Sequence, residues 1–423
     1  MKLPANFGTF RRLFANRNYR FYLAGIAASN VGIWVQRIAI GWLAWQLTES
    51  TAWLGAIAMA EAAPMMVLGL VAGTVVDRMD YLRLLRITQA ISLLYSAALA
   101  ILTVSGAMTI WLLLAISLLR GSTLAFQRPS RMSLVFSLIG RELLPTGLAL
   151  NSMVFNGSRF VGPAIGGVLI VAAGIGWAFA AATGLFFVFT LALGRLAVAP
   201  APRRAHNGSF AGESWEGLRY IALHPGIRMQ MVVLFATAFL GRPIIDLFPG
   251  FAAQVFLGGP DTLAALLSSL GLGATAGGLF LAMRSGGAKG LTAVTLSSMA
   301  LAALALLAFT ATDVLALALP LAAVLGFALI VQGVGNQTLI QSAVDPALRG
   351  RVISLYGTAA RATPSVGALV IGSLAEWGGL RLPMAAGALI YLAVWAWAWR
   401  RRRFYAENME GEPAEIGLAA PSR

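Results

Sequence analysis

Apolar runs of about 20 residues recur twelve times along the chain, and this pattern constrains the fold more than any other feature. A helix of that length crosses the ~30 Å hydrocarbon core of a bilayer. Of the 423 residues, 59% are hydrophobic and only 11% are charged, whereas soluble domains carry roughly 25% charged residues. We therefore predict an all-α membrane protein with twelve transmembrane helices, at 20–47, 52–76, 83–105, 109–129, 146–173, 176–197, 228–256, 262–284, 290–311, 313–341, 351–375 and 381–399.

Lysine and arginine are distributed unevenly between the two sets of loops. Of the 31 basic residues, 25 lie in the two tails and in alternate loops, whereas the opposite loops hold only Arg381. This asymmetry follows the positive-inside rule, which places both termini and the long central loop in the cytoplasm. We predict a multi-pass protein of the inner (plasma) membrane. Its net charge of +15 then reflects the membrane topology, and the basic residues also attract anionic lipid. We expect no nucleic-acid partner.

A polar interruption divides the spans into six and six. We predict an N-terminal half at 1–198, a cytoplasmic central loop at 199–226, a C-terminal half at 227–402 and a cytoplasmic tail at 403–423. Within the loop, the stretch FAGESWEGLRYIAL (210–223) has the pattern of an amphipathic interfacial helix, although a solvated connector fits it equally well.

A weak internal repeat supports the two halves. A shift of 209 positions aligns Gly32 with Gly241 and Arg37 with Asp246. Two six-helix halves related by pseudo-symmetry are one known transporter plan, although chance matches of glycine and proline can produce similar alignments.

The loop after the second span carries an acid and several bases at the cytoplasmic interface. Gly73 is followed by Asp77, Arg78 and Arg83, a pattern that resembles the loop signature of the major facilitator superfamily. The resemblance implies that the acid caps a helix in the other half and that the bases pair with acids, which latches one conformation. The positive-inside rule alone accounts for the two arginines but not for Asp77.

The fifth span carries closely spaced small residues. Arg159 precedes Gly162, Pro163, Gly166 and Gly167, and this stretch resembles the Gly-Pro-x-x-Gly-Gly motif of exporters in the same superfamily. Small residues at this spacing permit close helix packing, and proline supplies a kink or pivot. Ser158 stands where the longer family pattern has a glycine, so only the core of the motif is kept.

Further stretches extend the resemblance from about Phe14 to Arg400. They are SNVGIWVQRIAIGWL, FQRPSRMSLV, GRELLPTGLALNS and DPALRGRVISLYG. The chain resembles the transmembrane secretion effector and enterobactin exporter branch, also called the third drug-proton antiporter group. This resemblance implies the major facilitator fold and transport of a small molecule by alternating access.

Ionisable residues inside the predicted spans are candidate functional residues, because an ionised side chain at mid-bilayer costs about 2.5–3.5 kcal/mol. Seven residues qualify, and two of them, Arg120 and Arg242, could extend toward an interface. The seven are Arg37, Glu61, Arg120, Arg159, Arg242, Asp246 and Arg361.

The first helix has one polar face. Asn30, Trp34 and Arg37 follow one another at i, i+4 and i+7, and the repeat predicts that Asp246 faces them. A carboxylate shielded from water takes up a proton more readily than an exposed one. Asp246 is therefore the first candidate for proton coupling and Glu61 the second, with a fixed, non-titrating arginine pair as the alternative for each.

The balance of charges within the spans predicts the class of substrate. Five arginines against two acids favour an anionic or hydroxyl-rich compound over a lipophilic cation, with Arg37 and Arg361 as its contacts. Arg120 matches the fourth-helix arginine of the family, which implies a role in proton movement or in bonding between helices. On the tenth helix, Gln332 and Asn336 share a face and could bind substrate or neighbouring helices.

We predict a secondary active transporter that exports a small amphipathic compound, such as a siderophore or drug, in exchange for protons. An importer or lipid flippase on the same fold, or a membrane sensor, remains an alternative. The chain has no cysteine, and its only histidines, His206 and His224, lie in the central loop, so we expect no enzymatic activity and no metal site. We expect no cofactor, the proton gradient as the energy source, and a monomer whose partners are the substrate and the bilayer.

Overall fold

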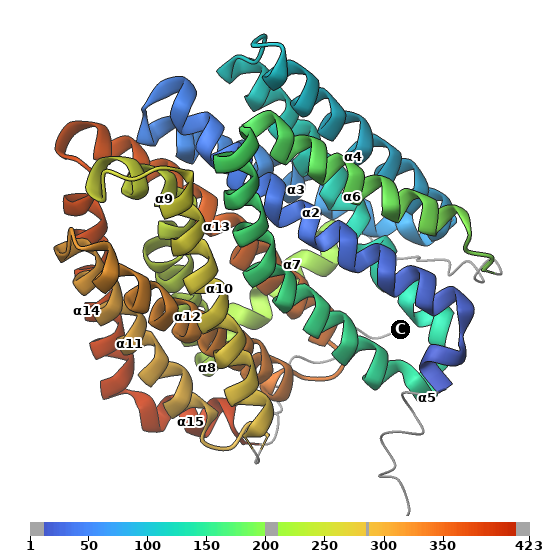
Figure 1. The fold of residues 1–423 in the computed structure, drawn as a ribbon. Coiled ribbons are helices and arrows are strands. Elements are labelled where there is room, and N and C mark those ends of the chain that lie inside the picture. The colour runs from blue at the N-terminus through green and yellow to red at the C-terminus, as the bar shows by residue number, and fades with distance from the viewer. Residues whose placement is uncertain (1–11, 199–209, 285–286, 412–423) are drawn as a thin grey trace, which may run out of the picture. The chain divides into compact units, whose positions relative to one another are not determined.

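The structure is a computed structural model that describes residues 12–198, 210–284 and 287–411. Within these residues it contains helices and no strands (Figure 1), which confirms the predicted all-α class. The chain forms two compact units. Unit 1 comprises Met1–Asn207 and Asp246–Gly271, and unit 2 comprises Gly208–Ile245 and Leu272–Arg423. Asp246–Gly271 thus belongs to unit 1, although the sequence assigns it to the C-terminal half. The boundaries at 198, 226 and 402 between the two halves, the central loop and the tail stay a prediction.

Long helices form the first part of unit 1, coloured blue to green in Figure 1. Helices α2 and α4 each pack against α5 and α6, and α3 packs against α5. Glycine allows the close approach of α2 and α6, because a Cβ added at Gly25 would lie only 2.6 Å from the Phe189 ring. The bounds are α2 Arg17–Thr48, α3 Thr51–Arg78, α4 Tyr81–Val104, α5 Ile110–Ala173 and α6 Ile175–Gly194.

Helix α5 contains both the fourth and the fifth predicted spans. The helical backbone continues past residue 129, where we predicted its end, and is interrupted only at Gly140, which has φ 68° and ψ 173°. Proline normally ends a helix by removing a hydrogen bond, but Pro129 lies inside this one. The predicted loop 130–145 is therefore mostly helical, and Arg128 and Arg131 lie on the transmembrane helix.

The remaining helices follow in chain order, and most of them belong to unit 2. Helix α11 packs against α12 and α14. The bounds are α7 Phe210–Leu223, α8 Pro225–Ala236, η1 Thr237–Gly241, α9 Ile244–Gly250, η2 Phe251–Val255, α10 Pro260–Met283, α11 Leu291–Ala311, α12 Leu315–Ala343, α13 Arg349–Gly378, α14 Arg381–Arg400 and α15 Arg402–Met409.

Eleven helical segments of the described chain are long and apolar enough to cross a membrane. They correspond to eleven of the twelve predicted spans. The remaining prediction, 351–375, coincides with α13, which is long enough but carries several charged and polar side chains. The structure is therefore consistent with twelve spans.

The central loop contains a helix, as predicted for residues 210–223. Helix α7 packs on α13, where Glu216 pairs with Arg351 at 2.6 Å and the Tyr220 hydroxyl accepts a hydrogen bond from the Asp345 N–H at 3.2 Å. Trp215 is exposed on α7. The contact of this helix with a membrane stays a prediction, and residues 199–209 lie outside the described chain.

His224 caps the first helix of the seventh span. It is 1% exposed, and its Nδ1 accepts a hydrogen bond from the Ile227 N–H at 3.2 Å. Only the neutral imidazole offers this acceptor, and burial lowers the pKa of His224 below the ordinary 6.5 of histidine. The cap therefore contributes its full stability above pH 6.5, and that contribution falls as the pH drops from 6.5 toward the folded-state pKa.

We predict that acidification from pH 7.5 to 5.5 lowers the stability of the protein by about 1 kcal/mol, the usual value of a helix cap. Asparagine also caps helices but does not titrate, so His224→Asn should abolish this pH dependence. Thermal unfolding in detergent at the two pH values measures the effect. His206→Asn, which changes the only other histidine, is the control. An unchanged pH dependence in His224→Asn would refute the assignment.

Candidate functional site

Asp246 lies on a broken helix. The predicted span 228–256 is an α-helix that is interrupted by two π-helical turns, η1 and η2, with the short helix α9 between them. Pro243 and Pro249 lie near these breaks. Single π-helical turns are rare and occur frequently at functional sites, and discontinuous transmembrane helices often carry the binding sites of transporters.

Asp246 forms an ion pair with Arg37 of α2. The Arg37 guanidinium nitrogen lies 2.6 Å from Asp246 Oδ1, and the two side chains are 37% and 17% exposed. Both residues belong to unit 1. The pair is thus shielded from most but not all solvent, so a proton can reach the carboxylate.

Glu61 forms a second ion pair, with Arg120. The distance is 2.6 Å, and the Arg120 side chain is only 4% exposed while Glu61 is 28% exposed. Helices α3 and α5 pack closely beside this pair, since a Cβ at Gly121 would overlap the backbone carbonyl of Glu61. This close packing keeps Glu61 within reach of Arg120. Ser117, one turn before Arg120, donates to the Leu113 carbonyl of its own helix.

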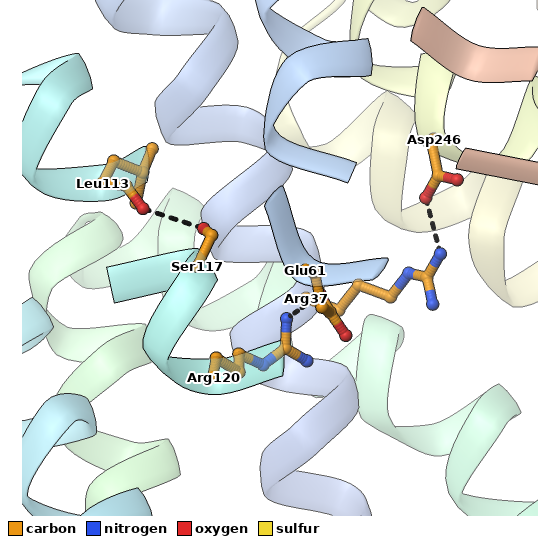
Figure 2. A network of polar contacts seen from close by, with 6 residues as sticks. All are labelled: Arg37, Glu61, Leu113, Ser117, Arg120 and Asp246. Carbon is orange, nitrogen blue, oxygen red and sulfur yellow. Dashed lines mark hydrogen bonds and ion pairs between the residues drawn. The ribbon is translucent and has the colours of Figure 1, made fainter. Parts of the chain in front are cut away.

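The two ion pairs lie next to each other (Figure 2). Glu61 lies within electrostatic range of the Arg37 guanidinium, in addition to Asp246. We call Arg37, Glu61, Arg120 and Asp246 the charge cluster. It contains two positive and two negative side chains and is therefore neutral when all four are ionised. A proton added to either acid leaves one arginine charge without its partner.

The exporter-like motif packs against the polar face of α2. Both Arg37 and Arg159 lie over the Trp34 ring, with guanidinium carbons 5.4 and 5.5 Å from its centroid. A Cβ at Gly162 would overlap Trp34, and one at Gly166 would lie 2.5 Å from Ile38. The glycines therefore seat α5 on α2 beside Arg37, and cation–π contacts favour keeping both arginines close to one ring.

The rest of this motif is also buried. Pro163 lies inside α5, and Gly167 approaches α10, where an added Cβ would overlap Ala264. Residues 246–271 belong to the same unit as α5. Small residues thus allow the fifth span to pack closely against the beginning of α10 within unit 1.

A buried polar network that the sequence did not predict lies in unit 1. Asn30 is 6% exposed, and its neighbour Ser29 accepts a hydrogen bond from Arg131 at 3.1 Å. Arg131 also donates to Gln127 Oε1 at 3.2 Å, and Gln127 donates to Ser92 at 2.9 Å. Arg120, Gln127 and Arg131 follow one another at i, i+7 and i+11, a spacing that indicates one polar face of a helix. Because Pro129 predicts a helix end, Arg131 falls in a predicted loop.

The predicted site residues of unit 2 are arranged differently. Gln332 and Asn336 are buried on α12, and the Tyr391 hydroxyl donates to Gln332 Oε1 at 2.8 Å. Gln332 Nε2 and Asn336 Oδ1 have no hydrogen-bond partner within the described chain. Arg361 is exposed on α13, and its guanidinium lies close to Gly357. Gln332, Asn336 and Arg361 are therefore not members of the charge cluster.

The loop signature after the second span is described only in part. Gly73, Asp77 and Arg78 lie on the helical backbone of α3, but the side chains of Asp77 and Arg78 lie outside the described part of the structure. Arg83 is exposed near the start of α4, and Asp80 caps this helix by accepting from the N–H groups of Leu82 and Arg83. The latch that the resemblance implies stays a prediction.

We predict that Glu61→Gln destabilises the protein by about 2–3 kcal/mol. Removal of one partner leaves a buried charge uncompensated, which costs about 3–5 kcal/mol when both groups are fully buried, and the partial exposure of Glu61 reduces that cost. Asp246→Asn should have a smaller effect, because Arg37 is 37% exposed. The double variant Glu61→Gln/Arg120→Gln should recover part of the loss, because no unpaired arginine then remains.

Thermal unfolding of the purified variants measures this order. Glu142→Gln is the matched control, because it breaks the exposed Arg12–Glu142 pair, whose side chains are 69% and 79% exposed and which should contribute little. Equal unfolding midpoints for Glu61→Gln and Glu142→Gln would show that the buried pair does not stabilise the fold.

Comparisons with known proteins agree with this architecture. The model of the transmembrane secretion effector family matches residues 11–415. The chain is 29% identical over 367 residues to the multidrug efflux pump Tap of Mycolicibacterium fortuitum, covering 83% of this chain and 88% of the relative. It is 30% identical to the staphyloferrin A transporter of Staphylococcus aureus over 141 residues, covering 33% and 36% of the two chains.

Solved structures share the fold. A bacterial homologue of the human lysosomal transporter Spinster superimposes with a TM-score of 0.71 at 15% identity, covering 94% of this chain and 99% of that one. A D-xylose-proton symporter gives a TM-score of 0.71 at 12% identity, covering 93% and 99%. The family and the structural neighbours are transporters rather than enzymes. The chain belongs to the transmembrane secretion effector family of major facilitator transporters.

Proposed function

We propose that this protein exports a small amphipathic anion across the plasma membrane in exchange for protons. The observation that carries the proposal is the Arg37–Asp246 ion pair, which joins α2 to the broken seventh helix at a partly solvated position. The pair supplies a titratable group, a cation for the substrate and a movable element in one place.

The coupling follows from charge. While Asp246 is ionised, it holds Arg37 at 2.6 Å. Either ligand can open this pair: a proton neutralises Asp246, or an anionic group of the substrate replaces Asp246 on the Arg37 guanidinium. The closed pair would hold the empty carrier in one state, so the carrier would return only with the other ligand bound. Alternate opening by substrate and by proton gives exchange of one for the other.

The broken helix supplies the movement. The π-helical turns η1 and η2 bracket α9, and such turns interrupt the regular hydrogen-bond ladder of a helix. The segment that carries Asp246 can therefore tilt without unfolding the rest of the span. Opening and closing of the ion pair would then change access to the site.

The relatives support export of a small molecule. One is named as a multidrug efflux pump and another as a staphyloferrin A transporter. The positive charges of unit 1 favour an anionic cargo, because arginine presents a rigid fork of donors that matches oxyanion groups. The membrane-spanning fold is shared with the family. The direction of transport, the coupling ion and the transported compound are what we propose for this protein.

We predict that Asp246→Asn abolishes the response to a proton gradient but preserves exchange. Inside-out vesicles with an acidic lumen should accumulate the anionic dye sulforhodamine B through the unmodified protein. In Asp246→Asn this gradient-driven uptake should fall at least tenfold, because the side chain no longer titrates. Exchange of labelled for unlabelled dye without a gradient should continue.

Asp261→Asn is the matched control, because this aspartate is exposed at the start of α10 and should leave uptake unchanged. Gradient-driven uptake by Asp246→Asn at the rate of the unmodified protein would refute the coupling assignment. Uptake driven by an acidic exterior instead would show that dye and protons move in the same direction, which would refute antiport.

A further inference from the structure

Arg128 is an arginine of the transmembrane part of unit 1 that lies outside both ion pairs. It lies on α5 two helical turns beyond Arg120, and its side chain is exposed. Within the described residues it has no ion-pair or hydrogen-bond partner. The nearby Arg131 differs, because Ser29 and Gln127 accept its hydrogen bonds.

Arg128 is electrostatically connected to the charge cluster. It lies within range of Glu61, Arg37 and Arg120. The cluster is neutral, so Arg128 adds one positive charge that no described side chain compensates. Arg128 is thus an exposed guanidinium on the same helix as Arg120 and within electrostatic range of the charge cluster.

An uncompensated arginine at this position is costly without a counter-ion. An ionised side chain within a membrane span costs about 2.5–3.5 kcal/mol on the lenient insertion scale. Exposure of the guanidinium lowers that cost, and a bound anion would lower it further. A guanidinium without protein partners retains all five N–H donors in a planar fork, the geometry that binds carboxylate, sulfonate or phosphate groups in a bidentate manner.

We infer that Arg128 is the residue that first binds the oxyanion group of the transported compound. The inference rests on the proposed function and assigns a specific residue to the recognition of substrate charge. An anion on Arg128 would also attract Arg37 and thereby weaken its pair with Asp246. Substrate binding would then open the same ion pair that a proton on Asp246 opens.

Equilibrium binding tests this role independently of proton coupling. The purified protein is placed in phosphatidylcholine nanodiscs without a gradient and titrated with sulforhodamine B, an anion, or rhodamine 6G, a cation with the same ring core. Fluorescence polarisation gives the Kd of each dye. Arg128→Gln should weaken binding of sulforhodamine B at least tenfold and should not weaken binding of rhodamine 6G.

Two further variants separate this role from folding. Arg128→Lys keeps the charge but loses the bidentate fork, and it should weaken sulforhodamine B binding by only about two- to fivefold. Arg219→Gln removes an exposed arginine of α7 and should leave both Kd values unchanged. Each variant should elute as a monodisperse peak and keep its unfolding midpoint.

Several results would overturn the inference. They are absence of saturable sulforhodamine B binding to the unmodified protein, equal weakening of both dyes in Arg128→Gln, or equal weakening in Arg219→Gln. Loss of dye binding when phosphatidylglycerol is added to the nanodiscs would reassign Arg128 to a lipid headgroup. Normal dye binding together with failed gradient-driven uptake would refute the proton coupling and leave the role of Arg128 intact.

Discussion

An ionised side chain inside a bilayer must be paired or must reach water, and the Arg37–Asp246 ion pair meets this requirement in a way that a proton can reverse. The pair is held at 2.6 Å but remains partly exposed. Glu61 and Arg120 form a more buried pair beside it. The two pairs differ mainly in their arginines, because Arg37 is 37% exposed whereas Arg120 is only 4% exposed. Arg37 is therefore the more accessible cation, and the buried Arg120 pair holds α3 and α5 in one arrangement.

The backbone around the cluster makes this arrangement possible. Glycine brings α5 against α3 at Gly121 and against α2 at Gly162, so the arginines and acids meet at short distances. The seventh span is interrupted by two π-helical turns on either side of α9. In the proposed mechanism, the close packing of α2, α3 and α5 keeps Arg37 in place while the irregular helix lets Asp246 move.

The sequence predicted the spans well because apolar runs reflect the thickness of the bilayer directly. It also singled out Arg37 and Asp246, since charges within such runs are conspicuous and a shift of 209 residues aligns them. The structure pairs these two residues. The sequence did not place Arg131 on α5, because Pro129 resembles a helix end whereas the helix continues to Gly140. The π-helical turns depend on tertiary packing, which residue periodicity does not encode.

The most direct test is the protonation state of Asp246 during substrate binding. Difference infrared spectroscopy follows the carbonyl stretch of a protonated carboxyl group when sulforhodamine B is added to the protein in nanodiscs. If substrate and proton replace each other at the Arg37–Asp246 pair, the band of protonated Asp246 should decrease when the dye binds to the unmodified protein at acidic pH, and this decrease should be absent from Asp246→Asn. An identical difference spectrum in both proteins, or no such decrease in either, would contradict a mechanism in which this ion pair couples protons to transport.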